Sequence, residues 1–267
     1  MQNIWTTWPD GKRALVTGST AGIGYAIAEG LAKEGAEVIV NGRSAERVAE
    51  AAGALNNATG TRAIGIAADL GSADGVMRLV NEAGRVDILV NNVGIFAPVP
   101  FTDISDDAWQ EIFDINVMSG VRLSRALVPG MVERGWGRII FISSESGVQI
   151  PAEMVHYGVT KTAQLALSRG IAESVAGTGV TANAVLPGPT RSEGVEEFVG
   201  KLADDQGADL ESFKHAFVKT MRPSSLIGRF AETKEVANLV VFLCGEGSSA
   251  ITGASLRVDG GVVRSIL

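Results

Sequence analysis

Tyr157 and Lys161 stand four residues apart in the sequence. That spacing places both side chains on one face of a helix, about one turn apart. A phenol has a pKa near ~10 and is a poor base at neutral pH, but a neighbouring ammonium favours the phenolate. We therefore expect Lys161 to lower the pKa of Tyr157, which then exchanges a proton with a substrate oxygen, as an acid in reduction and as a base in oxidation.

A glycine-rich loop lies near the start of the chain. Gly18, Gly22 and Gly24 follow the apolar run 13–17 and open an apolar helical stretch, 23–33. Glycine permits the sharp turn and the close approach of the backbone to a pyrophosphate, and a helix N-terminus offers free N–H groups to that anion. The loop therefore predicts a dinucleotide site at the carboxyl end of the first strand.

The elements that must position these groups are short apolar runs alternating with longer amphipathic stretches. Uniformly apolar runs are typical of strands covered on both faces. Their regular alternation with helices indicates parallel strands joined by right-handed crossovers. We predict an α/β fold with one doubly wound parallel sheet in a single domain, 1–267. The predicted strands are 14–16, 38–40, 64–67, 88–90, 139–142, 181–185 and 256–258. The predicted helices are 23–33, 45–56, 73–82, 107–133, 154–176 and 234–244.

Three motifs together make the chain similar to a known family. They are the loop G-x-x-x-G-x-G, the sequence N-N-V-G at 91–94, and Y-x-x-x-K at 157–161. In this order, over about residues 11–261, they resemble the short-chain dehydrogenase/reductase family. Val93 departs from the pattern, which usually has alanine there. The resemblance implies a seven-stranded, Rossmann-like sheet flanked by helices, and hydride transfer between a nicotinamide cofactor and a carbonyl group or secondary alcohol.

The resemblance also adds two residues to the catalytic pair. Ser144 follows the predicted strand 139–142 and matches the family's serine, which hydrogen-bonds the substrate oxygen. Asn116 matches the asparagine that holds a water linking the lysine to solvent. The expected catalytic residues are Ser144, Tyr157, Lys161 and Asn116.

Arg43 distinguishes between the two nicotinamide dinucleotides. The second predicted strand is followed by Asn41, Gly42 and Arg43, with no carboxylate to bond a ribose 2′-hydroxyl. A guanidinium suits a 2′-phosphate, so NADP(H) is expected in preference to NAD(H). The resemblance implies further contacts, among them Asp69 with the adenine. The expected cofactor-binding residues are Gly18, Ser19, Thr20, Gly22, Ile23, Gly24, Arg43, Asp69, Leu70, Asn91, Val93, Gly94, Tyr157, Lys161, Pro187, Gly188 and Thr190.

The segment 191–225 interrupts the alternation of strands and helices. A long insertion without a strand is usually functional, so we expect a lid over the substrate. The expected substrate contacts are Ser144, Phe96, Gln149 and Pro189. Because most candidate pocket residues are apolar, a hydrophobic or ring ketone is favoured. Glu145 follows Ser144, and the sequence leaves open whether it contacts the substrate or forms a local ion pair.

The overall composition excludes several classes of protein. The 267 residues carry a net charge of −7, whereas a general nucleic-acid binder needs a basic face. One cysteine and two histidines provide no disulfide and little material for a metal site, so no metal is expected. No signal peptide is recognisable, and no apolar run approaches the about 20 residues that span a bilayer. We expect a cytoplasmic protein without nucleic-acid or membrane partners and, from the resemblance, a homotetramer or homodimer.

Two other functions use part of the same residue set. A 3-oxoacyl-thioester reductase needs the same catalytic groups, but its acidic carrier protein would favour a basic rim, and the stretch 191–211 is acidic. A non-catalytic dinucleotide-binding sensor would tolerate the loss of Ser144, Tyr157 or Lys161, yet all three are present. A serine hydrolase is excluded because the chain lacks a G-x-S-x-G elbow.

Overall fold

A parallel sheet of seven strands forms the centre of the molecule. The computed structural model describes residues 11–196, 199–200 and 218–266, and the strands follow the order β3-β2-β1-β4-β5-β6-β9. The strands are β1 (Arg13–Val16), β2 (Glu37–Gly42), β3 (Ala63–Ala67), β4 (Ile88–Asn91), β5 (Gly137–Ile142), β6 (Val180–Pro187) and β9 (Ser255–Val258). Every neighbouring pair is parallel. The predicted seven-stranded, doubly wound sheet in a single domain is confirmed.

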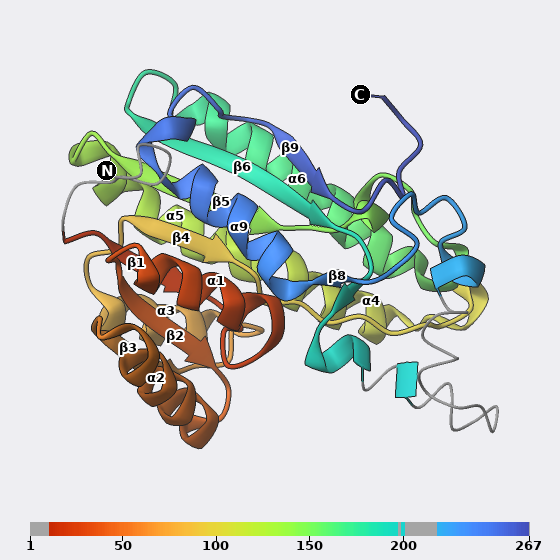
Figure 1. Ribbon diagram of the computed structural model, residues 1–267, viewed down its shortest axis with the longest axis horizontal. Helices are drawn as coiled ribbons and strands as arrows, with labels where there is room; N and C mark the ends of the chain where they lie inside the picture. Colours follow the sequence, from red (N-terminus) through yellow and green to blue (C-terminus); the bar gives the residue numbers. More distant parts are fainter. Residues whose placement is uncertain (1–10, 197–198, 201–217, 267) are drawn as a thin grey trace.

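Helices cover both faces of this sheet (Figure 1). One apolar core contains residues of α1 (Gly22–Lys33), α2 (Ala45–Thr59) and α9 (Thr233–Cys244). The other core contains residues of α3 (Ala73–Ala83), α5 (Ser119–Glu133) and α6 (Val155–Ser174). Since each helix has an apolar face, two helical layers enclose the sheet and keep its central strands from water.

The alternation of side chains along the central strands supplies both cores. In β1, Ala14 and Val16 belong to the core beneath α1, whereas Leu15 belongs to the opposite core. Ile88 and Leu89 of β4 are divided in the same way. Successive strand residues point to opposite faces, so a strand covered on both sides must be apolar throughout. This explains why these strands appeared in the sequence as continuous apolar runs.

The sheet reverses its strand order between β1 and β4. From β1 the chain winds outward through β2 to β3, and then returns to place β4 on the other side of β1. At such a switch point the loops after the two strands diverge and leave a crevice at the carboxyl edge. The glycine loop follows β1, so the fold places it at the edge of this crevice.

The predicted helix 107–133 is not one continuous α-helix. It consists of α4 (Asp106–Phe113), a π-helical turn η2 (Asp114–Met118) and α5. A π-turn inserts an extra residue into the helical repeat and shifts the side chains that follow it, and such turns are frequent at functional sites. Asn116 lies in η2, so the prediction of a regular helix was wrong at the position of an expected catalytic residue.

Smaller elements occur in the connecting segments. A second sheet joins β7 (Thr190–Arg191) to β8 (Ala231–Glu232). Short 3₁₀-helices are η1 (Phe101–Asp103), η3 (Glu145–Gly147), η4 (Ala152–Met154) and η5 (Glu246–Ser248). The predicted lid, 191–225, lies partly outside the described residues. Within the described part of the chain, no helix combines the length and apolarity that crossing a membrane would require.

Candidate active site

The glycine loop is held between the ends of β1 and β4 by a network of polar contacts. Asn92 Nδ2 donates to the carbonyl oxygens of Thr17 at 2.9 Å and Gly18 at 3.0 Å. Thr17 Oγ1 accepts hydrogen bonds from the backbone N–H groups of Asn92 and Val93. Gly18 has a φ of 59°, a backbone conformation that residues with a Cβ rarely adopt. The loop is therefore shaped by its own backbone and by Asn92 before any ligand binds.

Gly24 allows helix α1 to begin against this loop. A Cβ at Gly24 would overlap the carbonyl oxygen of Gly18 and lie 2.5 Å from Asn92 Nδ2. Since the obstruction is backbone, Gly24→Ala is expected to cost about 2 kcal/mol and to lower Tm by about 5 °C in a thermal-unfolding scan. Gly53→Ala, in α2 where a Cβ meets nothing within 4 Å, is the matched control and should be neutral or stabilising. Equal Tm values for the two variants would contradict this account.

A cleft of about 930 Å³, its open mouth included, extends from the glycine loop along the carboxyl ends of β1, β2 and β4. Seven of the expected cofactor residues line it: Gly18, Thr20, Arg43, Asp69, Leu70, Val93 and Gly94. Arg43 is exposed and forms no ion pair with a described residue, whereas Arg47, in the same cleft, pairs with Glu193 at 2.9 Å. Of the two arginines that line the cleft, Arg43 is therefore the one whose guanidinium is not paired with a carboxylate of the described chain.

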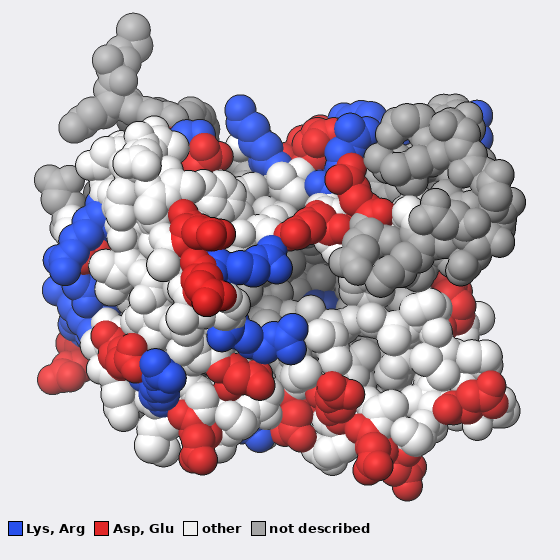
Figure 2. All heavy atoms as spheres, turned by 90° about the horizontal axis from the view of Figure 1, so that it is seen from below, with Lys and Arg blue, Asp and Glu red and all other residues white. Residues whose placement is uncertain are grey.

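The charged side chains do not form a continuous basic surface on the face shown in Figure 2. That face is hollowed near its middle, and Lys and Arg side chains border the hollow beside Asp and Glu side chains. A basic group beside acidic ones suits a single phosphate better than a long polyanion.

A second cleft, of about 660 Å³, continues the first, and Gly94 lines both. It contains the expected catalytic side chains and the turn that follows β6. The expected residues in its wall are Ile23, Gly94, Phe96, Ser144, Tyr157, Lys161, Pro187, Gly188, Pro189 and Thr190. A Cβ at Gly94 would lie 3.3 Å from Asn116 Oδ1 and 3.4 Å from Lys161 Nζ, so glycine keeps the passage between the two clefts open.

Tyr157 and Lys161 face the same cleft from the first turns of α6. Lys161 Nζ lies 5.5 Å from the centre of the Tyr157 ring. Nζ donates to the carbonyl oxygen of Ile142, at the end of β5, at 2.9 Å. Ser143 Oγ donates to the carbonyl oxygen of Lys161 at 2.8 Å. These two bonds fasten α6 to the carboxyl end of β5, where Ser144 follows, and so bring the three expected catalytic side chains together.

The electrostatics of Tyr157 differ from the expectation. Burial raises the pKa of Tyr157, and the carboxylate of Glu145 raises it further. A hydrogen bond with Ser144 and the charge of Arg222 oppose this rise in the pKa. The prediction that Lys161 lowers the pKa of Tyr157 was wrong for the protein without a ligand, because burial dominates and the opposing cation is Arg222. Tyr157 is therefore a protonated phenol at neutral pH.

Lys161 is itself strongly affected by its surroundings. Burial lowers the pKa of Lys161 to about 8, and the nearby Glu145 opposes that shift. Its amine approaches Gln164 Oε1 at 3.3 Å, and Gln164 Nε2 donates to the backbone oxygen of Asn116 at 2.6 Å. Asn116 directs its side chain to both backbone polar groups of Ile95. A glutamine thus links Lys161 to the π-turn that contains Asn116.

One acidic and one basic residue lie beside Ser144. The sequence left the role of the acidic residue, Glu145, open, and it did not indicate the basic residue, Arg222. Glu145 Oε2 accepts a hydrogen bond from Ser144 Oγ at 2.5 Å. Glu145 Oε1 accepts one from Arg222 Nε at 2.9 Å, so the ion pair of Glu145 is distant in sequence and not local. Both line a pocket of about 530 Å³ together with Phe96, Ser144, Ser146, Met154, Tyr157, Pro189, Val195 and Phe230. No sequence motif marked Arg222.

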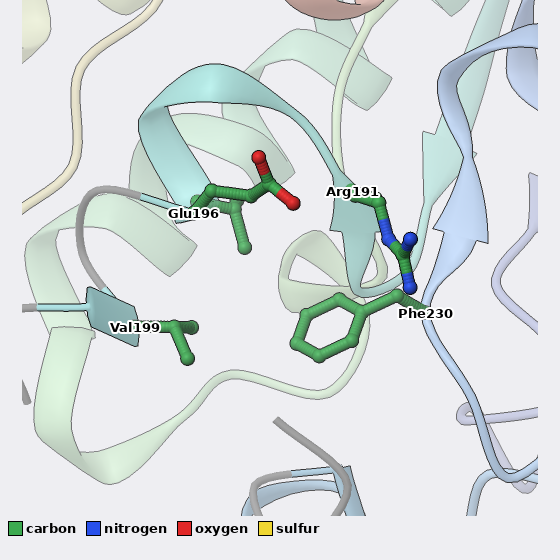
Figure 3. Close-up of a pocket in the computed structure, with 5 residues that line it drawn as sticks. Arg191, Glu196, Val199 and Phe230 are labelled. Carbon is green, nitrogen blue, oxygen red and sulfur yellow. The ribbon is translucent and has the colours of Figure 1, made fainter. Parts of the chain in front are cut away.

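A smaller hollow of about 190 Å³ adjoins this pocket and shares Val195 and Phe230 with it. Figure 3 shows Arg191, Glu196, Val199 and Phe230 around this hollow. Phe230 packs with Val199 in an apolar cluster separate from the two main cores. The apolar side of the larger pocket therefore continues into a small, mainly apolar recess.

Some expected site residues do not line these clefts. The side-chain amide of Asn91 is buried and has no hydrogen-bond partner among the residues that the structure describes, and Asn92 lines the cleft instead. Gln149 is exposed and lies outside the pocket walls. Ser19 is buried and donates to the carbonyl oxygen of Val16. Gly22 and Gly24 shape the loop without lining its cleft. In the described part of the chain, no three His, Cys, Asp or Glu side chains cluster as metal ligands would.

A family model described as short chain dehydrogenase matches residues 12–202. The chain belongs to this family. This short-chain dehydrogenase is 48% identical over 257 residues to the uncharacterized oxidoreductase YvaG of Bacillus subtilis, with 96% of this chain and 97% of that protein covered. It is 36% identical over 257 residues to a 3-oxoacyl-acyl-carrier-protein reductase of Aquifex aeolicus, with 94% and 97% covered.

Among solved structures, this short-chain dehydrogenase resembles an L-sorbose reductase from Gluconobacter frateurii complexed with NADPH and L-sorbose. The TM-score is 0.93, the identity is 35%, and the match covers 98% of this chain and 100% of the other. The expected family and fold are confirmed. The expected enzyme class, an oxidoreductase that acts on carbonyl and alcohol groups, is confirmed as well. The alternative of a non-catalytic sensor is set aside.

Proposed function

We propose that the protein reduces a carbonyl group with NADPH, using Ser144, Tyr157 and Lys161 as its catalytic residues. The observation that carries this proposal is their arrangement: all three side chains line one cleft, which opens through Gly94 into the cleft of Arg43 and the glycine loop. The glycine loop and the start of α1 would hold the phosphates of a dinucleotide bound along both clefts, and Tyr157 would lie on the side of its nicotinamide.

The residues present fit this cofactor. Gly18 and Gly94 line the clefts without a side chain, and Ile23, in the first turn of α1, lines the second cleft, so the N-terminus of this helix would face the phosphates. Arg43 suits the 2′-phosphate, and Asp69 lies in the same cleft for the adenosine part. Pro187, Gly188 and Thr190 form the wall beside Tyr157. When bound, the dinucleotide supplies the hydride that adds to the carbonyl carbon.

Tyr157 supplies the proton in this scheme. Its raised pKa keeps the phenol protonated at neutral pH, which is the form needed to donate to the carbonyl oxygen as the C–O bond becomes an alcohol. Ser144 holds the same oxygen by a hydrogen bond. In the reverse direction Tyr157 must first lose its proton, so alcohol oxidation is expected to accelerate as the pH rises.

The direct test is the consumption of NADPH, followed by its absorbance, over a panel of ketones. Turnover of at least one ketone supports the proposal, and a complete absence of turnover over the panel, with NADPH bound, contradicts it. The panel also includes 3-oxoacyl thioesters. They test the second candidate function, 3-oxoacyl-thioester reduction, which is the activity in the name of one relative.

Arg43→Ala is expected to weaken NADPH binding by tenfold or more, about the contribution of one or two charge-assisted hydrogen bonds, with little effect on NADH. The measurement is KM for each dinucleotide with one ketone. Arg47→Ala is the matched control, because Arg47 lines the same cleft but is engaged by Glu193, and its effect should be smaller. If Arg43→Ala raised KM for NADPH and NADH by the same factor, Arg43 would not be the ligand of the 2′-phosphate.

Further parts of the expectation stay proposals. We infer that 191–225 acts as a lid, supported by Val195 and Arg222, which lie near its two ends and line the substrate pocket. Asn116 is proposed to position Lys161 through Gln164. A homotetramer or homodimer in the cytoplasm is supported only by the resemblance and by the composition.

A further inference from the structure

The substrate pocket has one polar side within otherwise apolar walls. Its apolar lining is supplied by Phe96, Met154, Pro189, Val195 and Phe230. Apart from the catalytic hydroxyls and Ser146, the polar side is the ion pair of Glu145 with Arg222, whose side chains are only 6% and 14% exposed. The apolar walls suit the carbon skeleton of a substrate. The buried ion pair needs a separate explanation, because taking both charges out of water is unfavourable.

Ser144 has a single hydroxyl proton, which it can donate to only one acceptor at a time. Oγ donates to Glu145 Oε2 at 2.5 Å and accepts from the backbone N–H of Ser146 at 3.1 Å. When Ser144 donates to the carbonyl oxygen of a substrate, Glu145 Oε2 loses this donor. A buried carboxylate oxygen without a donor is unfavourable, so a substrate that brings its own donor is favoured over one that does not.

Arg222 is already engaged by two carboxylates. Its Nε donates to Glu145 at 2.9 Å, and its Nη1 lies 3.5 Å from Glu153 Oε1. Among the residues found to line this pocket, Arg222 is the sole cationic side chain. A carboxylate would therefore meet a guanidinium already shared between two carboxylates, which disfavours an anionic substrate.

We propose that the pocket takes a neutral ketone with a hydroxyl group on the carbon next to the carbonyl. The hydroxyl donates to Glu145 Oε2, replacing Ser144, while Ser144 and Tyr157 hold the carbonyl oxygen. The two oxygens of such a ketone are carried by adjacent carbons, and the Ser144 and Glu145 oxygens that bind them lie 2.5 Å apart. The inference rests on the proposed function and adds its substrate class and the residue that selects it.

The test compares hydroxyacetone, fluoroacetone and pyruvate in NADPH-dependent turnover by the wild-type protein. All three are methyl ketones, and they differ in the second group on the carbonyl carbon. It is a hydroxymethyl group, a fluoromethyl group that withdraws electrons without donating a hydrogen bond, or a carboxylate. We expect kcat/KM for hydroxyacetone to exceed that for fluoroacetone by at least about tenfold, because a site built for a donor rejects an analogue that lacks it. Pyruvate should be the poorest of the three.

Glu145→Gln tests the residue itself. A neutral amide accepts a weaker hydrogen bond than a carboxylate, so the preference for hydroxyacetone over fluoroacetone should fall at least about threefold. Glu153→Gln is the matched control, because it removes the other carboxylate beside Arg222. Glu153 does not line the pocket, so the preference for hydroxyacetone should be retained.

The outcomes separate this inference from the proposed function. A wild-type protein that reduces fluoroacetone or pyruvate as well as hydroxyacetone overturns the inference and leaves the proposed function standing. An unchanged preference in Glu145→Gln overturns the assignment to Glu145. If no ketone of any kind is reduced, the proposed function fails and the inference fails with it. The wild-type comparison decides the substrate class even if Glu145→Gln does not fold.

Discussion

Tyr157→Phe is expected to lower kcat/KM for ketone reduction by about 10³-fold, within the range that general acid catalysis contributes. The variant removes only the hydroxyl group, whose raised pKa keeps it protonated and able to donate at neutral pH. The ring of Phe96 lies 6.1 Å from the Tyr157 ring, and this packing persists in the variant. The measurement is the initial rate of NADPH consumption with saturating cofactor.

The control for this variant is cofactor binding. NADPH titrated into Tyr157→Phe by fluorescence should give a Kd within about threefold of the wild-type value, because phenylalanine keeps the shape of the cleft wall. A loss of activity with unchanged binding assigns the hydroxyl to the chemical step. Turnover equal to that of the wild-type protein would show that another group supplies the proton.

The fold was predictable because its signals are local and repeated. Val38 and Ile39 of β2 pack in opposite cores, so the strand is apolar at every position and stands out from the amphipathic helices beside it. The glycine loop was recognisable because positions 18 and 24 require glycine. The backbone at position 18 has a positive φ, and a Cβ at position 24 would overlap the carbonyl oxygen of Gly18. Tyr157 and Lys161 were found because their spacing matches one helical turn.

The rest of the site depends on contacts that no local pattern records. Arg222 reaches Glu145 across 77 residues of sequence, and nothing in the neighbourhood of either residue indicates the other. The π-turn at Asn116 changes the register of a helix whose apolar pattern is continuous in the sequence. The pKa of Tyr157 follows from burial, which outweighs the pairwise effect that the four-residue spacing suggested.

Lys161→Met is expected to abolish most activity and also to stabilise the protein at neutral pH. Burial lowers the pKa of Lys161 from 10.5 to about 8 in the folded protein, a difference that corresponds to about 3 kcal/mol. Below pH 8 the amine is charged in both the folded and unfolded states, and the folded protein bears the full cost of burying it. Between about pH 8 and 10.5 the unfolded state binds more protons, so wild-type stability rises with pH.

Methionine has no such titration, so the advantage of Lys161→Met should shrink as the pH rises from 8 to 10.5. Urea unfolding of both proteins at several pH values measures this difference in the free energy of unfolding. The two hydrogen bonds that Lys161 makes to Ile142 and Gln164 reduce the difference in the free energy of unfolding at pH 7. They do not remove the dependence of this difference on pH. Lys234→Met, at an exposed lysine, is the matched control. A pH-independent difference would mean that burial does not penalise the charged amine. A pH-dependent difference would mean that the folded protein holds a destabilising charge at this position, which is typical of functional sites.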